Sequence, residues 1–204
     1  ADPAGVLAAE PRPALGAFKH EAACVDPVDG RLYLTEDNSG AGFYRFTPDD
    51  YPDISKGALE VAMVDGSGNV TWQPVPDPTT AATGTPTRQQ VPGMTTFNNA
   101  EGIWYWRGVT YFTTKPDKVV WAYDIRAGTI ERLFDRGVAA DSSLDAVDNV
   151  TVSPTGDVLI CEDGGNMEIG IITPAREVAP LIRFEGPDHD NSEVCGVVFS
   201  PAGD

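Results

Sequence analysis

The sequence predicts an all-β protein, more specifically part of a β-propeller, and three observations support this prediction. The 204 residues include 21 glycines and 17 prolines, which indicates many turns between short strands. No segment keeps an apolar period of 3.6 residues, which argues against long helices. A unit made of an acidic residue, an apolar stretch, a glycine turn and an alternating strand recurs along the chain, as expected for propeller blades.

The recurring unit starts at an acidic residue that lies seven to ten residues before a turn glycine. The four acids are Glu21, Glu101, Asp148 and Glu193, and the glycines that follow them are Gly30, Gly108, Gly156 and Gly203. Proline and glycine favour the backbone angles of tight turns. Hairpin turns are therefore predicted at Pro27–Gly30, Pro154–Asp157 and Pro201–Asp204.

Strands are predicted after these turns because the segments there are rich in β-branched and aromatic residues. They are Leu32–Thr35, Val109–Thr113 and Val158–Cys161. Similar segments between the units predict further strands at Gly42–Thr47, Leu59–Val64, Val119–Ile125 and Glu131–Phe134.

The spacing of the four acids, 80, 47 and 45 residues, sets the expected size of each unit. A propeller blade of four short strands takes about 40–50 residues. The longest interval predicts either one enlarged blade, with Pro74–Pro92 as an insertion loop, or nearly two blades. We therefore expect about four to five blades. We expect residues 1–15 to be a lead-in segment and residues 16–204 to be a partial propeller domain cut at both ends.

The charge of the chain excludes several classes of partner. Acidic residues outnumber basic ones 31 to 14, which gives a net charge of −17. Nucleic-acid binding and polybasic membrane contact both need clustered lysine and arginine, so neither is expected. No run approaches the roughly 20 apolar residues of a membrane-spanning helix. The first residues lack a signal peptide, so an export signal has been removed or was not included.

The four repeated acids are candidate metal ligands. The innermost strand of each propeller blade lines a central channel, so an acid at its start would meet its counterparts at the channel mouth. Grouped carboxylates need cations between them or a raised pKa, and oxygen ligands select calcium or magnesium. Iron becomes possible when a thiolate joins. Glu21, Glu101, Asp148 and Glu193 are the candidates, while turn-capping acids or a solvated rim remain the alternative.

Several neighbouring polar residues have two interpretations. Asn98, Asn99 and Asn149 could add carbonyl oxygens to a calcium shell, or could bond their own backbone in turns. The pairs Glu36–Asp37 and Glu162–Asp163 are expected to be solvated turn residues, at the far end of their strands from the first acids.

The histidines and cysteines give weaker signals. His20 is expected to face away from Glu21 and to be packed and hydrogen-bonded, where it could support the site or touch substrate. His189 is expected in an exposed loop. Cys24, Cys161 and Cys195 are expected to be buried thiols, with Cys161 as an alternative iron ligand. No nucleophile elbow, phosphate-binding loop or dinucleotide fingerprint is present.

Five segments in order resemble the PhoX-type secreted alkaline phosphatases over roughly residues 16–204: GAFKHEAACVDPVDGRLYLTED, GFYRF, AEGIWYW, DNVTVSPTGDVLICEDGG and SEVCGVVFSP. The resemblance implies a six-bladed propeller that hydrolyses phosphomonoesters with a calcium–iron cluster on its axis. It also implies export by the twin-arginine route, to the periplasm or beyond. By motif, Glu21, Glu101 and Asp148 correspond to cluster ligands, and Glu193 matches a motif position.

Two departures from the family separate the functional hypotheses. Asn99 stands where many members carry a basic residue that suits a phosphate group. The family's iron-binding Cys-Glu segment precedes the KHEA motif, and nothing before Phe18 matches it, so iron is expected only in the complete protein. The main hypothesis is a calcium-dependent phosphomonoesterase acting on a small substrate. A non-catalytic calcium-binding extracellular propeller and a calcium-dependent lactone or ester hydrolase are the alternatives.

Overall fold

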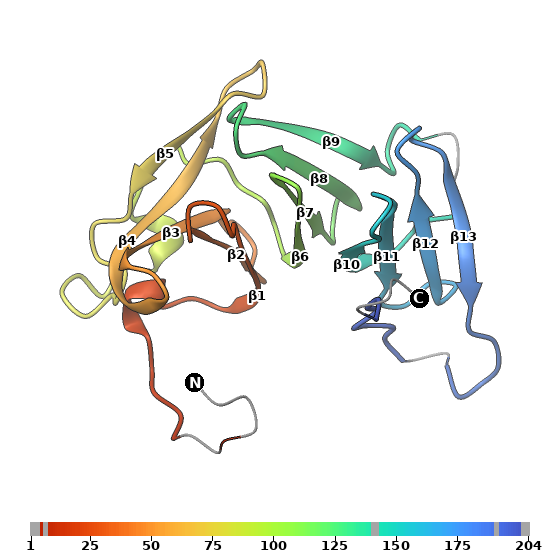
Figure 1. Ribbon diagram of the computed structural model, residues 1–204, viewed down its shortest axis with the longest axis horizontal. Coiled ribbons are helices and arrows are strands. Elements are labelled where there is room, and N and C mark those ends of the chain that lie inside the picture. Colours follow the sequence, from red (N-terminus) through yellow and green to blue (C-terminus); the bar gives the residue numbers. More distant parts are fainter. Residues whose placement is uncertain (1–4, 6–7, 140–142, 190–191, 201–204) are drawn as a thin grey trace.

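The chain is built almost wholly from β-strands, as its computed structural model shows for residues 5, 8–139, 143–189 and 192–200 (Figure 1). Two short 3-10 helices, η1 (Pro13–Leu15) and η2 (Thr87–Gln89), accompany thirteen strands in these residues. The first five strands are β1 (His20–Val25), β2 (Leu32–Glu36), β3 (Tyr44–Asp50), β4 (Asp53–Val64) and β5 (Val70–Pro74). The next four are β6 (Ala100–Trp106), β7 (Val109–Thr114), β8 (Val119–Asp124) and β9 (Thr129–Asp135). The last four are β10 (Val147–Val152), β11 (Val158–Glu162), β12 (Glu168–Ile172) and β13 (Val178–Arg183).

These strands form three antiparallel sheets, each with its strands side by side in chain order. The sheets are β1–β5, β6–β9 and β10–β13. The prediction of an all-β protein is therefore confirmed. The 80-residue interval between Glu21 and Glu101 contains one five-stranded sheet followed by a loop, which includes η2 in the predicted Pro74–Pro92 insertion.

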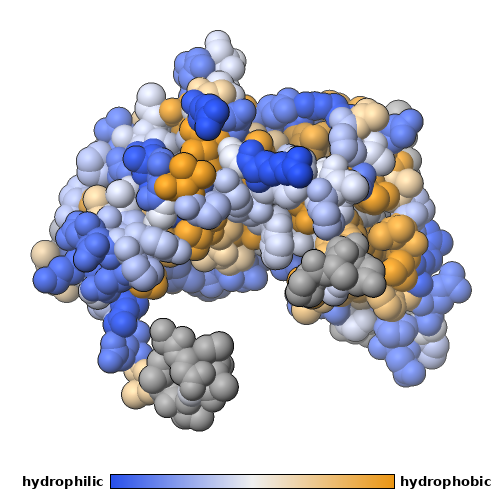
Figure 2. All heavy atoms as spheres, viewed as in Figure 1, coloured by the Kyte–Doolittle hydropathy of each residue, from blue (hydrophilic) through white to orange (hydrophobic). Residues whose placement is uncertain are grey.

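Two apolar cores hold neighbouring sheets together. Aromatic rings dominate the core between the first two sheets, where Phe43 stacks on Phe112 with ring centroids 4.5 Å apart. Aliphatic side chains such as Val150 and Ile160 dominate the core between the second and third sheets. Because both faces of the second strands are covered, every residue of β2 and β11 is buried. The visible outer surface is mostly hydrophilic, with scattered apolar patches (Figure 2).

The first strand of each sheet lies toward the middle of the molecule, whereas β5, β9 and β13 lie at its outside (Figure 1). Strand β6 contacts both β1 and β10, so the three first strands are neighbours. Gly102 in β6 permits the close approach to β10. A methyl group added at Gly102 would meet the Cα of Asn149 and the backbone nitrogen of Val150, both at 2.8 Å.

We expect Gly102→Ala to destabilise the chain by about 1–3 kcal/mol, because rigid backbone atoms leave no room for the added carbon. The free energy of unfolding in urea measures this effect. Gly66→Ala is the matched control, since its added carbon would meet nothing within 4 Å. Equal stability of the two variants would contradict the close approach of β6 and β10.

The structure differs from the predicted elements in two places. Strands β5, β12 and β13 were not among the predicted segments. The fourth unit forms only an isolated bridge between Asp163 and Glu193 in the described residues, and Val197 and Phe199 then pack against the apolar side of β11. A strand needs backbone pairing along its length, whereas the described backbone pairing of this segment with β11 is limited to the bridge and the bond from the Val194 N–H to the Glu162 carbonyl. Gly203 and the Pro201–Asp204 turn lie outside the described residues, and the number of blades stays a prediction.

Candidate metal centre

Three of the four predicted acids occupy the same position in their sheets. Glu21, Glu101 and Asp148 are each the second residue of a first strand. In each sheet the pairing register between the first and second strands shifts at the acid, within His20–Ala23, Ala100–Ile103 and Val147–Val150. Such irregularities redirect side chains away from the regular pleat. The repeat in the sequence thus corresponds to a repeated local geometry.

Threonine hydroxyls join two of the three acids, Glu101 and Asp148, to the preceding sheet. Thr35 in β2 donates a hydrogen bond to the backbone carbonyl of Glu101 at 2.6 Å. Thr113 in β7 donates in the same way to the carbonyl of Asp148. Both threonines are fully buried, so these bonds fix the backbone of the two acids relative to the neighbouring sheet.

The acids also influence one another's charge. Burial, together with the nearby carboxylates of Asp148, Asp37 and Glu21, raises the pKa of Glu101 to about 8, although Lys115 acts to lower it. Burial likewise raises the pKa of Glu21, with added effects from Asp148, Asp37 and Glu193. All four predicted acids therefore belong to one electrostatic cluster.

Glu101 is the least compensated member of this cluster. Glu101 is only 5% exposed, and its carboxylate has no hydrogen bond or ion pair with the described residues. A buried carboxylate without a donor is unfavourable when ionised. It is the kind of group that a bound cation would stabilise.

The second acidic set is placed differently from the expectation. Because β1 and β2 run antiparallel, His20 pairs with Glu36, and the end of the second strand lies beside the start of the first. Val147 pairs with Glu162 in the same way. The prediction that these acids lie far from the first set was wrong, since it ignored the direction of the paired strand.

Nor are Glu36 and Glu162 solvated, since both are fully buried. Glu36 accepts hydrogen bonds from the hydroxyl of Tyr44 at 2.7 Å and from the guanidinium of Arg88 at 3.0 Å. Glu162 accepts three backbone N–H groups, from Asp145, Ala146 and Glu168. Each carboxylate thus satisfies donors that come from other parts of the chain.

The residue after each second strand completes the candidate site. Asp37, Lys115 and Asp163 each donate a backbone N–H to the carbonyl oxygen of the residue immediately before a first strand, with N–O distances of 3.0, 3.1 and 3.0 Å. The three side chains are therefore equivalent in position, although one is a cation. Lys115 was not among the predicted site residues, and recognising it requires the strand register.

Lys115 is the cation of the cluster. Its ammonium donates to the carboxylate of Asp148 at 3.0 Å and also to that of Asp163. It therefore joins the end of the second sheet to the third. It also partly offsets the mutual repulsion of the acids.

The remaining predicted polar residues lie around this cluster. His20 stacks on Phe18, with centroids 3.8 Å apart, and its Nε2 lies 2.8 Å from the carbonyl oxygen of Gly16. Asn99 has a positive φ of 44° and donates its side-chain amide to Asp37 at 2.7 Å. Asn149 accepts the backbone N–H of Gly196 at 3.3 Å. Asn98 accepts the N–H of Gly40 at 2.6 Å.

Cysteine chemistry contributes little to the site as it stands. Burial raises the pKa of both Cys24 and Cys161, which favours the neutral thiols. Cys195 is exposed, contrary to the expectation of a buried thiol, because its segment forms no strand beyond the Glu193 bridge. His189 lies near Phe184, with ring centroids 5.8 Å apart.

The chemical type of the donor atoms fits a calcium ion, whereas the present distances between the donor side chains do not. Carboxylate oxygens are the ligands that calcium prefers, and the unpartnered Glu101 faces other carboxylates. However, no three His, Cys, Asp or Glu side chains in the described part of the chain are grouped closely enough to hold a metal ion. Lys115 instead provides the positive charge next to Asp148.

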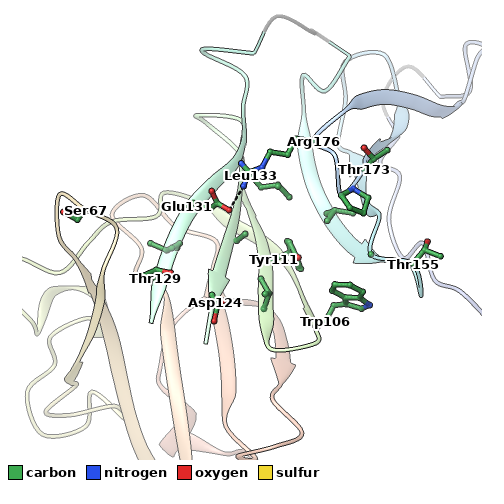
Figure 3. Close-up of a pocket in the computed structure, with 16 residues that line it drawn as sticks. Ser67, Trp106, Tyr111, Asp124, Thr129, Glu131, Leu133, Thr155, Thr173 and Arg176 are labelled. Atoms are coloured by element: carbon green, nitrogen blue, oxygen red, sulfur yellow. Dashed lines mark hydrogen bonds and ion pairs between the residues drawn. The ribbon is translucent and has the colours of Figure 1, made fainter. Parts of the chain in front are cut away.

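A pocket elsewhere in the molecule does not include the cluster. It has a volume of about 690 Å³ and lies between the second and third sheets, where Trp106 and Tyr111 form part of its wall (Figure 3). Glu131 and Arg176 form an ion pair of 2.6 Å at this pocket (Figure 3). Both side chains are more than half exposed, so the ion pair contributes little stability.

The raised pKa of Glu101 predicts a pH dependence for the metal-free chain. Folded Glu101 keeps its proton up to about pH 8, whereas the unfolded side chain loses it near its ordinary value of 4.5. The contribution of Glu101 to the free energy of unfolding should therefore be most favourable below pH 4.5, and it should fall as the pH rises to about 8. Urea unfolding in the presence of a chelator, at pH 5 and pH 8, measures the difference. Glu101→Gln should reduce it, and an unchanged difference would refute the assignment.

Comparison with known proteins gives one family. The family described as alkaline phosphatase PhoX matches residues 2–122 and 115–204. No curated protein matches the chain significantly. Among solved structures, the extracellular domain of a hybrid two-component system from B. thetaiotaomicron is similar at 16% identity, with a TM-score of 0.38. The match covers 80% of this chain and 25% of that structure, so the chain spans a quarter of its length. In the described residues, no helix has the length and apolar character needed to cross a membrane.

Proposed function

Because the chain belongs to the PhoX family of alkaline phosphatases, we propose that it forms the metal-binding part of a calcium-dependent phosphomonoesterase. The observation that carries the proposal is the position of Glu21, Glu101 and Asp148, each at the same irregularity of a first strand. Their mutual effect on the pKa of Glu101 supports a shared cation.

We further propose that the three sheets are consecutive blades of a propeller. Each sheet is an antiparallel meander, and its first strand lies next to the first strand of the following sheet. This arrangement would place the acids around one axis, as the repeat predicts. Residues 16–204 are then a partial propeller domain, and residues 1–15 a lead-in.

In this proposal Glu21, Glu101 and Asp148 hold calcium, with Glu193 at the edge of the set. A bound divalent cation would supply positive charge to the phosphoryl oxygens of the substrate. The buried threonine bonds to Glu101 and Asp148 would keep the ligands in place. Iron would require ligands from outside this set, because the Cys161 thiol is buried and its pKa is raised.

The proposed substrate is a small phosphomonoester, and the proposed location is the periplasm or the extracellular space. The family supports both, and the net charge of −17 suits neither nucleic acid nor anionic membranes as a partner. Asn99 supports keeping one alternative, a calcium-binding propeller without catalysis. Its amide is held by Asp37 and carries no charge for a phosphate group.

Metal content tests this proposal first. We expect plasma mass spectrometry to find at least one calcium per chain after purification without a chelator, and less in Glu21→Gln. A panel of a phosphate monoester, a lactone and a carboxylic ester then separates the alternatives. Phosphate release supports the phosphatase, lactone or ester hydrolysis supports the hydrolase, and calcium without turnover supports the binding module. A folded chain without metal would overturn the calcium site.

A further inference from the structure

Lys115 occupies a position that carries an acid in the other two sheets. Asp37, Lys115 and Asp163 each follow the last residue of a second strand and make the same backbone hydrogen bond. The backbone of Lys115 is fixed by its N–H bond to the carbonyl of Asn99 at 3.1 Å. Its side chain is thus directed by the fold to the same end of the sheets as the first-strand acids.

The ammonium of Lys115 already occupies the place of a cation on Asp148. It lies 3.0 Å from Oδ2 of Asp148, whose side chain is only 7% exposed, and it also bonds the Asp163 carboxylate. The Lys115 side chain itself is 36% exposed, so it has room to move toward solvent. A carboxylate has lone pairs for more than one partner, but an ammonium and a divalent cation on the same carboxylate repel each other at short range, so a bound cation favours departure of the lysine.

The surrounding groups are almost all acidic. The ammonium bonds the carboxylates of Asp148 and Asp163 and acts on the charges of Glu21 and Glu101, which are also influenced by Asp37 and Glu193. Lys19, the other nearby cation, is 4.0 Å from Asp37, and its side chain is 69% exposed. Lys115 therefore contributes the main positive charge that acts on both Glu21 and Glu101.

We propose that Lys115 is a built-in counter-cation of the carboxylate cluster, which a divalent cation must displace from Asp148 in order to bind there. The inference rests on the calcium site proposed above. In the metal-free chain Lys115 stabilises the folded cluster by pairing with Asp148 and Asp163. When calcium binds, Lys115 leaves Asp148, so the lysine lowers the affinity of the site.

Calcium titration of the 204-residue chain tests the proposal without any activity assay. We expect Lys115→Gln to bind calcium about tenfold more tightly than the natural chain by isothermal titration calorimetry. Calcium should also raise the melting temperature of Lys115→Gln by more than it raises that of the natural chain, because the metal-free variant has lost its counter-charge. Lys115→Met keeps the aliphatic stem and provides a second test should Lys115→Gln fold poorly.

Two control variants separate this effect from a general change in charge. Lys115→Arg keeps the cation and should retain the affinity of the natural chain. Lys118→Gln removes an equally exposed lysine, at 37%, whose ammonium pairs with Asp145 at 2.7 Å and, in the described residues, with no carboxylate of the cluster. Its calcium affinity should equal that of the natural chain.

The possible outcomes are distinguishable. Tighter binding in Lys115→Gln alone supports the counter-cation. Equal or weaker binding in Lys115→Gln overturns it but leaves the calcium site standing. If neither the natural chain nor Lys115→Gln or Lys115→Met binds calcium, both the counter-cation and the proposed calcium site fail.

Discussion

Under the proposed function, Asp148→Asn is expected to lower calcium affinity at least about tenfold and to abolish hydrolysis of p-nitrophenyl phosphate with it. The substitution keeps the shape of the side chain and removes its charge. The Asp148 carboxylate is buried and affects the pKa of both Glu21 and Glu101, so it is central to the cluster. An amide oxygen is a weaker calcium ligand than a carboxylate oxygen, and it leaves Lys115 with one anionic partner fewer.

Calorimetric titration and phosphate-release kinetics on the same preparations measure these two effects. Asp49→Asn is the control, because it removes one negative charge from an exposed residue at the end of β3. If both variants bind calcium equally, the effect of Asp148 reduces to net charge and the site assignment fails. If Asp148→Asn keeps calcium but loses turnover, Asp148 acts on the substrate and not on the metal.

The strands with strong alternating or β-branched patterns could be predicted from the sequence, whereas three others could not. Strand β12 contains Gly170, which normally weakens the prediction of a strand. Here the glycine avoids a clash, because a methyl group would lie 2.2 Å from a terminal carbon of the buried Leu144, which would have to shift. Strand β13 contains Pro180, which is tolerated because the strand is at the edge of its sheet. The reasons for both residues lie in tertiary contacts that a local pattern does not contain.

The part of the candidate site that follows the sequence repeat could be predicted. Glu21, Glu101 and Asp148 recur in the sequence, and their equivalence follows from the repeat alone. Lys115 could not be predicted from the repeat, because a lysine stands where the other two sheets have Asp37 and Asp163. Only the antiparallel register brings the end of one strand beside the start of another.

The local sequence pattern also could not predict that Glu36 and Glu162, in the second acidic set, are buried. A carboxylate beside a turn is solvated unless the chain brings donors to it from elsewhere. Arg88, which pairs with Glu36, is 52 residues away and comes from the insertion loop. The donors to Glu162 come from the residues before β10 and from the start of β12. Neither set of partners is visible in the sequence around the acid.

Glu162→Gln should lower the free energy of unfolding by about 2–3 kcal/mol, although it changes one oxygen to an amide group. One carboxylate oxygen of Glu162 accepts the N–H groups of Asp145 and Ala146, at 2.7 and 3.1 Å. The other accepts the N–H of Glu168 at 3.0 Å. A glutamine can satisfy only one side, because its amide nitrogen is a donor and would face another donor.

The loss should therefore exceed that of an ordinary surface substitution, and urea unfolding at neutral pH measures it. Glu131→Gln makes the same chemical change at a side chain that is 57% exposed and pairs with Arg176, and it should alter stability by less than about 1 kcal/mol. A similar small effect for Glu162→Gln would mean that the three backbone groups find other acceptors. A large effect would show that this acid holds the entry to β10, and with it the backbone from which Asp148 reaches the cluster.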